Sequence, residues 1–441
     1  MWSPIGMFEP LYTAAEMKAA EADHDVEQLM ERAGRAVADE ILARFPGSRS
    51  FAAVCGGGAN GGDGRIAAEL LRTAGWEERS VGDADVVVDA LFGTGFRGPP
   101  REEAARQIQS MNESGAPVVA VDIPSGVDAS TGEVPGEAVR AELTVTFHGR
   151  KVGHEVAPGR FHRGEVVVAD IGLEHRETKH ALVTRAILGI VPRRRPGDTK
   201  YTAGSVLVVG GSPGMTGAVC LAAEAAFRAD AGYVTVAAPA ESLPVIEIRV
   251  LEAVKRPLDE VWSAVERARG LAVGPGLGRQ RGELVRRLLE ETDLPAVVDA
   301  DALYELEPVE RSAGMVLTPH SGELARLLGV EAEWVDAHRL EALIRATDRF
   351  RCVVLLKGEG TLVGAPGAGA LVCGGFRSLA TAGTGDVLTG VIASFLAKGM
   401  DVRLAAAAAA VAHTEAAIAV PHRSGLIASD LLAALPRVLD A

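Results

Sequence analysis

The chain has 441 residues, which is too long for one domain of ordinary size, so we expect two or three. Its formal net charge of −14, without a basic stripe, argues against nucleic acid and anionic membranes as partners. The cysteines Cys55, Cys220, Cys352 and Cys373 lack metal-ligand spacing and predict reduced thiols in a cytoplasmic protein. The N-terminus lacks signal-peptide features, and the Ala-rich run 404–412 predicts a buried helix rather than a membrane span.

Short Val, Ile and Ala runs alternate with helical patterns along the whole chain, which is typical of βαβ units and parallel sheets covered on both faces. The first predicted strands are FAAVC from residue 51, DVVVDALF from 85, PVVAVDI from 117 and LTVTF from 143. A second series comprises SVLVVGG from 205, YVTVAA from 233, LAVGPG from 271, AVVDA from 296, MVLTP from 315 and CVVLLKG from 352. The charged segment 172–204, with its prolines and glycines, lies between the two series. We therefore predict an α/β protein with unlike domains at 1–178 and 199–441, joined by a linker at 179–198.

The segment CGGGANGGDGRIAAELL, residues 55–71, follows the first predicted strand and precedes a helical pattern over 65–72. Gly56, Gly58 and Gly61 fit G-x-G-x-x-G, in which phosphate binds at a helix N-terminus. Alone this motif is weak, and a structural turn explains it equally well. The sequence has no clear acidic partner about 20 residues on, which disfavours an ordinary NAD-dependent dehydrogenase.

Polar residues follow three of these strands: Asn60 and Asp63 after the first, Asp89 after the second, and Asp122 and Ser125 after the third. Because parallel strands end at one edge of a sheet, we expect these side chains to converge. Their oxygen atoms suit a hard, monovalent cation, and Asp122 is a candidate general acid or base.

Two nearby features have competing interpretations. Asp128, followed by Ser130 and Thr131, is typical of a turn rather than of a reactive site. Lys151 is equally compatible with a solvated side chain and with a ligand-binding one.

The stretches LMERAGRAVADEI, GGGANGGDGRIAAELL, VVDALFGTGFRGP and VAVDIPSGVDASTGE resemble, in this order, the NAD(P)H-hydrate epimerase domain, over about residues 10–170. The resemblance implies a Rossmann-like, three-layer α/β/α domain in which Asn60, Asp89 and Ser125 bind potassium and Asp122 transfers protons. It places the hydrated dinucleotide on Ala59, Asn60, Gly61, Gly62, Asp63, Gly93, Thr94, Gly95, Phe96, Arg97, Gly98, Pro99 and Asp122. Ala59 stands where the family has asparagine.

In the second half, TAGTGDVLTGVIASFLAKG from Thr381 predicts a glycine turn that leads into an apolar helix. The N–H groups of Gly383 to Gly385 can stabilise charge on a transferring phosphoryl group, and Asp386 can accept a proton from a hydroxyl. The alternative is that Asp386 only caps the helix. His320 is expected on a loop and Glu323 as a helix cap, while Lys357, at a strand end before glycine, favours a phosphate-binding role.

This half, about residues 195–440, resembles the ADP-dependent NAD(P)H-hydrate dehydratases, which have a ribokinase-like fold. The resemblance implies substrate contacts by Ala218, Gly276, His320 and Asp386. It implies nucleotide contacts by Lys357, Gly358, Glu359, Gly360, Thr361 and Gly385. The chain departs from the family at Thr199, where histidine is usual, and over residues 375–380.

Together the two resemblances imply an enzyme that repairs hydrated nicotinamide cofactors. It would interconvert the R and S epimers of NADHX and NADPHX and dehydrate the S form with ADP and Mg²⁺, giving AMP and phosphate. We also expect a homo-oligomer. The alternatives are a ribokinase-like kinase of a vitamin-precursor alcohol and a non-catalytic nucleotide sensor. Both Asp122 and Asp386 are present, which disfavours the sensor.

Overall fold

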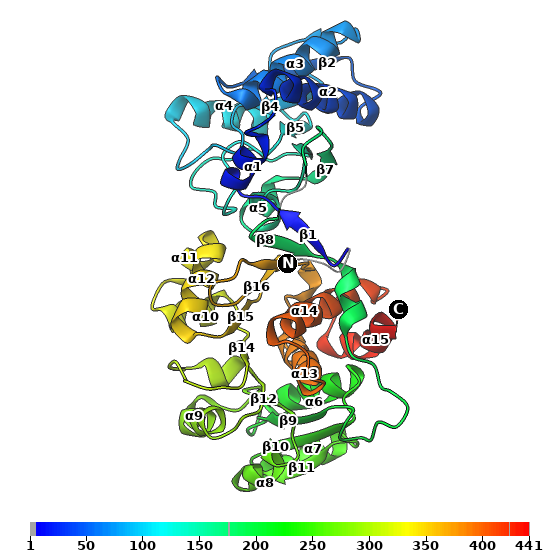
Figure 1. Cartoon of the computed structure of the whole chain (residues 1–441), viewed down its shortest axis with the longest axis vertical. Helices are drawn as coiled ribbons and strands as arrows, with labels where there is room; N and C mark the ends of the chain where they lie inside the picture. Colours follow the sequence, from blue (N-terminus) through cyan, green and yellow to red (C-terminus); the bar gives the residue numbers. More distant parts are fainter. Residues whose placement is uncertain (1–5, 175–176, 423, 441) are drawn as a thin grey trace. The chain divides into compact units, whose positions relative to one another are not determined.

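A computed structural model describes residues 6–174, 177–422 and 424–440 (Figure 1). The predicted domain limits at residues 1 and 441 lie outside this description. The chain divides into two compact units. The smaller unit is Pro10–Leu182 with Asp336–Leu340, and the larger contains Val183–Val335, Glu341–Ala441 and the stretch that ends at Glu9. Strands β1 (Phe8–Leu11) and β8 (His180–Val183) lie where the chain passes from one unit to the other.

The smaller unit is built on a parallel sheet of order β3-β2-β4-β5-β6-β7. Its strands are β2 (Ser50–Cys55), β3 (Glu77–Glu78), β4 (Val86–Ala90), β5 (Val118–Val121), β6 (Leu143–Phe147) and β7 (Glu165–Ala169). The four strands expected from the sequence are confirmed. The sequence analysis missed β3, which has two residues, and β7, whose burial is interrupted.

Helices cover both faces of this sheet because successive strand residues point to opposite sides. Val86 and Val88 pack with α1 (Ala14–Glu21), α2 (Val26–Arg44) and α3 (Ala59–Thr73) on one face. Val87 packs with Ile108 and Met111 of α4 (Glu102–Glu113) on the other. The short elements α5 (Val152–Glu155) and η1 (Gly159–His162) follow β6. These layers confirm the expected three-layer α/β/α arrangement.

In the larger unit the strand order is β17-β16-β15-β14-β13-β12-β9-β10-β11. The bounds are β9 (Ser205–Val209), β10 (Tyr233–Ala238), β11 (Val254–Pro257), β12 (Gly270–Val273), β13 (Ala296–Val298), β14 (Met315–Leu317), β15 (Val353–Leu356), β16 (Thr361–Gly364) and β17 (Leu371–Cys373). The six predicted strands are present. The expectation of purely parallel pairing is wrong at one end, because β15, β16 and β17 pair antiparallel through short connections.

Helices flank this sheet on both sides (Figure 1). On one side lie α6 (Thr216–Arg228), α13 (Thr384–Ala397), α14 (Val402–Ala419) and α15 (Ala428–Asp440). On the other lie α9 (Gly282–Glu290), α10 (Ser321–Leu328), α11 (Ala332–Ala337) and α12 (Arg339–Phe350). The short α7 (Leu243–Arg249) and α8 (Val261–Val265) adjoin β11.

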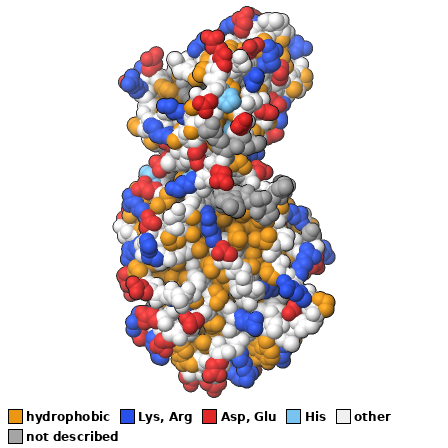
Figure 2. Space-filling model, in the orientation of Figure 1, with side chains coloured by type: hydrophobic (Ala, Val, Ile, Leu, Met, Phe, Trp, Pro, Cys, Tyr) orange, Lys and Arg blue, Asp and Glu red, His pale blue; other side chains and the backbone are white. Residues whose placement is uncertain are grey.

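Helix α14 is long and apolar enough to cross a membrane by length and composition alone. However, 67% of its apolar window is buried within the structure, and it packs against α13 and α15. This confirms the prediction of a buried helix over 404–412. All four cysteines are free; Cys55 is half-buried and the others are buried. Figure 2 shows acidic and basic side chains interspersed on the visible face, without a continuous basic stripe.

Candidate functional sites

A cavity of about 810 Å³ lies at the carboxyl ends of β2, β4 and β5 in the smaller unit. Ten of the residues predicted to bind ligand line it: Ala59, Asn60, Asp63, Gly93, Thr94, Gly95, Phe96, Arg97, Pro99 and Asp122. Gly61, Gly62 and Gly98 are not lining residues. Glu21 and Phe147 also line the cavity, and neither was predicted, because neither belongs to a glycine motif.

The glycine motif forms the start of a helix rather than a loop before one. Helix α3 begins at Ala59, with Gly58 as its N-cap, so the expected start at residue 65 is wrong. The helix starts early because its glycines allow close backbone packing: a Cβ on Gly61 would lie 1.9 Å from the carbonyl oxygen of Gly56. The early start places Asn60 and Asp63 at the helix N-terminus, beside the cavity.

This packing predicts a stability effect. Replacement of Gly61 by alanine should lower the free energy of unfolding of the smaller unit by about 2–3 kcal/mol, because the methyl group would clash with backbone. A Cβ on Gly57 meets nothing within 4 Å, so Gly57→Ala should change stability by less than about 0.5 kcal/mol. Urea unfolding followed by circular dichroism compares the two variants. Equal effects would contradict the close-packing explanation.

The three predicted cation ligands lie around the backbone of Phe92. Ser125 Oγ donates to Asp89 Oδ1 at 2.6 Å and accepts the Phe92 N–H at 2.8 Å. Asn60 Nδ2 donates to the Phe92 carbonyl oxygen at 2.9 Å. Burial raises the pKa of Asp89 to about 6, against hydrogen bonds from Ser125 that lower it. The cluster offers amide, hydroxyl, carbonyl and carboxylate oxygens, a donor set that suits potassium.

The side chain of Asp122 forms a hydrogen bond with a buried lysine, Lys151. The backbone of Asp122 has φ 66°, a conformation unusual outside glycine. Lys151 is fully buried, and its Nζ donates to Asp122 Oδ1 at 2.5 Å, to Thr146 Oγ1 at 2.8 Å and to the Phe147 carbonyl at 2.9 Å. Thr146 Oγ1 also donates to Asp122 Oδ1, at 2.9 Å. The interpretation of Lys151 as a solvated side chain is therefore wrong.

His154 fixes the backbone of the same aspartate. Its Nδ1 accepts the Lys151 N–H at 3.0 Å, so the proton resides on Nε2, which donates to the Asp122 carbonyl oxygen at 2.9 Å. Burial, followed by the charge of Lys151, lowers the pKa of His154 to about 3. The imidazole is therefore neutral and serves to hold Asp122 in place.

Asp63 lines the same cavity, and no Lys, Arg or His among the described residues forms an ion pair with it. It is 8% exposed, and its Oδ1 has no hydrogen-bond partner within the described ranges. Burial raises the pKa of Asp63 to about 8, with further contributions from the charges of Asp122 and Glu21. The pKa of Glu21 is also raised, first by burial and then by Asp122. Asp63 therefore holds a proton near neutral pH.

Arg97, in the glycine segment 93–99, is tied to the turn that follows β5. It forms an ion pair with Asp128 Oδ2 at 3.0 Å and donates to Ser130 Oγ at 2.8 Å. Asp128 Oδ1 accepts the N–H groups of Ser130 at 2.8 Å and Thr131 at 3.2 Å, which confirms the predicted turn. The turn thus anchors one wall of the cavity.

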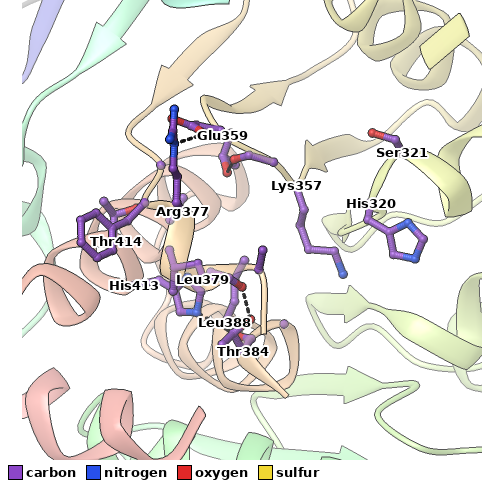
Figure 3. A pocket seen from close by; sticks show the side chains of 17 residues that line it. His320, Ser321, Lys357, Glu359, Arg377, Leu379, Thr384, Leu388, His413 and Thr414 are labelled. Carbon is purple, nitrogen blue, oxygen red and sulfur yellow. Dashed lines mark hydrogen bonds and ion pairs between the residues drawn. The ribbon is translucent and has the colours of Figure 1, made fainter. Parts of the chain in front are cut away.

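The larger unit contains a second cavity, of about 670 Å³ (Figure 3). Of the predicted residues, His320, Lys357, Gly358, Glu359, Thr361 and Gly385 line it. Ala218, Gly276, Gly360 and Asp386 are not among its lining residues. Ala218 and Gly276 lie together elsewhere: a Cβ on Gly276 would be 3.3 Å from that of Ala218 and 2.4 Å from the Met215 carbonyl oxygen.

Lys357 lies between the cavity and a buried carboxylate. Its Nζ donates to Asp299 Oδ1 at 2.8 Å, and Thr389 Oγ1 donates to Asp299 Oδ2 at 2.7 Å. Burial acts to lower the pKa of Lys357, but Asp299 and Glu323 together raise it above its usual value. Lys357 therefore keeps its positive charge. Asp299 was not predicted as a site residue, although it directly follows the buried strand β13, as Asp122 follows β5.

Asp386 is the third residue of α13, whose N-cap is Gly383. The alternative of Asp386 as the cap residue is therefore wrong. Gly385 adjoins Lys357, because a Cβ there would lie 3.5 Å from Nζ. Burial raises the pKa of Asp386 to about 7; Asp299 raises it further and Lys357 opposes the shift. A carboxyl group with this pKa can accept a proton near neutral pH.

His320 caps helix α10 rather than only lining the cavity. Its Nδ1 accepts the Gly322 N–H at 3.0 Å, and Glu323 Oε2 accepts the His320 N–H at 2.9 Å. This confirms the capping role expected for Glu323. The imidazole of His320 is 58% exposed.

The segment that departs from the resembled family forms part of the second cavity. Gly375, Phe376, Arg377, Leu379 and Ala380 line it, and Arg377 Nε lies 3.6 Å from Glu359 Oε2 (Figure 3). The missed residue His413 of α14 lines the cavity too, and its Nε2 lies 2.9 Å from the Thr384 carbonyl oxygen. Burial lowers the pKa of His413 to about 4, so it is neutral and donates that hydrogen bond.

Comparison with known proteins agrees with the division of the chain into two units. A family model for NAD(P)H-hydrate dehydratase matches residues 206–437, and one for the YjeF-related protein N-terminus matches 26–81 and 76–153. The chain is 36% identical to the bifunctional NAD(P)H-hydrate repair enzyme Nnr of Moorella thermoacetica, over 97% of this chain and 96% of that protein. It is 33% identical to the Escherichia coli (strain K12) protein of the same name, over 94% and 89%.

A solved structure resembles the larger unit. The ADP/ATP-dependent NAD(P)H-hydrate dehydratase of Bacillus subtilis, co-crystallised with ATP/Mg²⁺, has a TM-score of 0.54 and 29% identity. The match covers 58% of this chain and 96% of that one. A ribokinase-like superfamily protein of Enterococcus faecalis shares the fold, with a TM-score of 0.54 at 23% identity.

Proposed function

The chain belongs to the family of bifunctional NAD(P)H-hydrate repair enzymes, and we propose that its two cavities catalyse successive steps of one repair. The smaller unit epimerises the R and S forms of NADHX and NADPHX at C6. The larger unit dehydrates the S form with ADP, giving NAD(P)H, AMP and phosphate. One observation carries this assignment: a chain related over 97% of its length to such an enzyme has a cavity in each unit, with Asp122 lining one and Asp386 next to Gly385, which lines the other.

In the smaller unit, the N-terminus of α3 and the segment 93–99 would bind the dinucleotide through backbone N–H groups. Both line the cavity that contains Asp122. Exposed N–H groups at a helix N-terminus suit a pyrophosphate, even in a chain with a net charge of −14. Asp122, fixed by Lys151 and His154, is placed to transfer protons at the hydrated ring.

Asn60, Asp89 and Ser125 would hold a potassium ion, together with the Phe92 carbonyl oxygen. When bound, the ion would supply positive charge that favours the ionised form of Asp89 and offsets the carboxylates of this cavity. If potassium supports binding, its replacement by tetramethylammonium should weaken binding of the hydrated dinucleotide, because that cation cannot enter an oxygen cage. Calorimetric titration at constant ionic strength measures this. Equal affinity in the two salts would contradict the potassium site.

In the larger unit, Asp386 would accept the proton of the C6 hydroxyl as that oxygen attacks the terminal phosphorus of ADP. Lys357 and the N–H groups of Gly383 to Gly385 would stabilise charge on the transferring group. The described residues contain no cluster of three metal-ligating side chains. Mg²⁺ would be held mainly by nucleotide phosphates, with a carboxylate such as Asp299. The phosphorylated oxygen then leaves as phosphate, and loss of a C5 proton restores the double bond.

The role of Asp386 predicts a pH dependence. Its pKa, raised to about 7, means that the base is ionised above that pH and protonated below it. The initial rate of S-epimer dehydration at low substrate should therefore fall as pH decreases, to about one tenth of its plateau one pH unit below the pKa. Rates measured from pH 5.5 to 9 test this. A rate that is constant between pH 6 and 8 would contradict Asp386 as the base.

The whole assignment is tested with purified protein, an equal mixture of R and S NADPHX, and ADP. Recovery of NADPH absorbance from both epimers, faster than without enzyme, is the expected result. Recovery of the S share alone would remove the epimerase assignment. No recovery of either would remove the dehydratase assignment. A hydroxylated vitamin precursor that consumed nucleotide instead would identify a kinase.

The remaining assignments concern the whole protein. We place the epimerase activity in residues 1–178 and the dehydratase activity in 199–441, with a linker at 179–198. We also propose that the enzyme is cytoplasmic, consistent with its free thiols, and forms a homo-oligomer.

A further inference from the structure

Asp63 and Asp122 are two of the four carboxyl-bearing residues that line the cavity of the smaller unit, and their surroundings differ. We propose that Asp63 is the general acid and Asp122 the general base of the epimerase, and that Lys151 is the positioning residue that holds the Asp122 carboxyl group. The proposal rests on the epimerase function of this unit.

Asp122 is paired with a cation. Its Oδ1 accepts hydrogen bonds from the Lys151 ammonium at 2.5 Å and the Thr146 hydroxyl at 2.9 Å. Lys151 is fully buried and also donates hydrogen bonds to Thr146 Oγ1 and the Phe147 carbonyl oxygen, so Asp122 is its anionic partner. Separating the pair would leave an unpaired buried charge, which is costly. The Asp122 side chain is 12% exposed and lines the cavity, so it can still reach a ligand.

Asp63 has the opposite surroundings. It is more than nine-tenths buried, lines the cavity, and has an Oδ1 without a hydrogen-bond partner among the described residues. The charged groups that act on it are the carboxylates of Asp122 and Glu21, and both disfavour a further negative charge. A neutral carboxyl group with a free oxygen, facing a cavity, is a ready proton donor. The raised pKa of Asp63, about 8, agrees with this arrangement.

The chemistry of the substrate requires one donor and one acceptor. C6 carries the hydroxyl group and is bonded to the ring nitrogen. When Asp63 protonates the hydroxyl, the C6–O bond breaks, the nitrogen lone pair forms a C=N bond, and water leaves. Water then adds to the opposite face: a new C6–O bond forms, the C=N electrons return to nitrogen, and Asp122 takes the released proton. Return of that proton to Asp63 restores the enzyme, so the step needs no oxidant or reductant.

The test is the rate–pH profile of epimerisation, followed by chromatographic separation of the epimers without ADP. The wild-type rate should fall above pH 8 as Asp63 ionises. Asp63→Asn should lower the rate at pH 7 by about 10²–10³-fold and remove that alkaline decline. Lys151→Met should lower the rate more at pH 6 than at pH 9, because it removes the cation that is paired with the Asp122 carboxyl group. Thr146→Val, a smaller change, should move the acidic limb in the same direction.

Several results would overturn the proposal: a wild-type profile without an alkaline limb, an unchanged limb in Asp63→Asn, or losses in Lys151→Met and Thr146→Val that are equal at all pH values. The wild-type profile decides the role of Asp63 even if a variant fails to fold. Circular dichroism melting checks that the smaller unit of each variant is folded, and ADP-dependent dehydration of pure S epimer checks that the larger unit is intact. If the wild type dehydrates the S epimer but never converts R to S, the epimerase assignment itself fails.

Discussion

Asp386→Asn is expected to reduce ADP-dependent dehydration of the S epimer by at least about 10³-fold, because the amide cannot accept the proton of the C6 hydroxyl. The substitution conserves the shape of the side chain at the third position of α13. It also removes a carboxyl group whose pKa burial raises to about 7, so the fold should be retained or stabilised near neutral pH. NADPH absorbance, with purified S epimer and saturating ADP, measures the rate.

A matched control lies at the start of the next helix. Asp401 is the N-cap of α14, where its Oδ1 accepts the N–H groups of Arg403 and Leu404, and asparagine caps helices equally well. Asp401→Asn should therefore keep full activity. Nucleotide binding by Asp386→Asn should persist, since Lys357 and the glycine N–H groups remain. Retention of more than about a tenth of the rate by Asp386→Asn would refute its role as base.

Asp122→Asn should stop the conversion of R to S while leaving dehydration of the S epimer unchanged. The amide cannot serve as a base, and it leaves the buried Lys151 ammonium without its anion. We expect the enzymatic epimerisation rate to fall by at least about 10²-fold. With an equal mixture of epimers and ADP, the S share should recover at the normal rate and the R share only at the spontaneous rate.

Asp170 provides the control for this variant, because it follows β7 in the same sheet but does not line the cavity. Asp170→Asn should epimerise at the wild-type rate. The rate at which the larger unit dehydrates the S epimer serves as an internal standard, because it reports the quality of the substrate in every sample. Normal use of the R epimer by Asp122→Asn would show that another group transfers the proton.

Much of the fold follows from local sequence. Strands β4, β5 and β6 are buried at every position, and their sequences are mainly apolar, with Asp89, Thr144 and Thr146 as the polar positions. The antiparallel strands β16 and β17 were not predicted, because they are short and follow β15 without an intervening helix. The start of α3 was predicted six residues late, because glycine has a low helix propensity and only packing against Gly56 explains its presence there.

In the candidate sites, too, some residues could be predicted from the sequence and others only from the structure. Motifs placed Asn60, Asp63, Asp122 and Lys357 at cavity walls, since residues that follow parallel strands share one edge of a sheet. The family resemblance implied that Ala218 and Gly276 contact the substrate together with His320. In the structure they lie together beside Met215 and do not line the cavity of the larger unit. Residues 375–380 differ from the family's motif, so no role was predicted for them, although most of them line the cavity of the larger unit.

The sequence by itself determined the family, the two α/β units, and the glycine-flanked carboxylates, because each is specified by a short run of neighbouring residues. Only the tertiary structure decided the charge states. Lys151 meets Asp122 across 29 residues, and Thr389 meets Asp299 across 90. Asp63, in contrast, lacks a partner for Oδ1 among the described residues. The charge of a buried group depends on which distant atoms surround it, and no local pattern in the sequence records that.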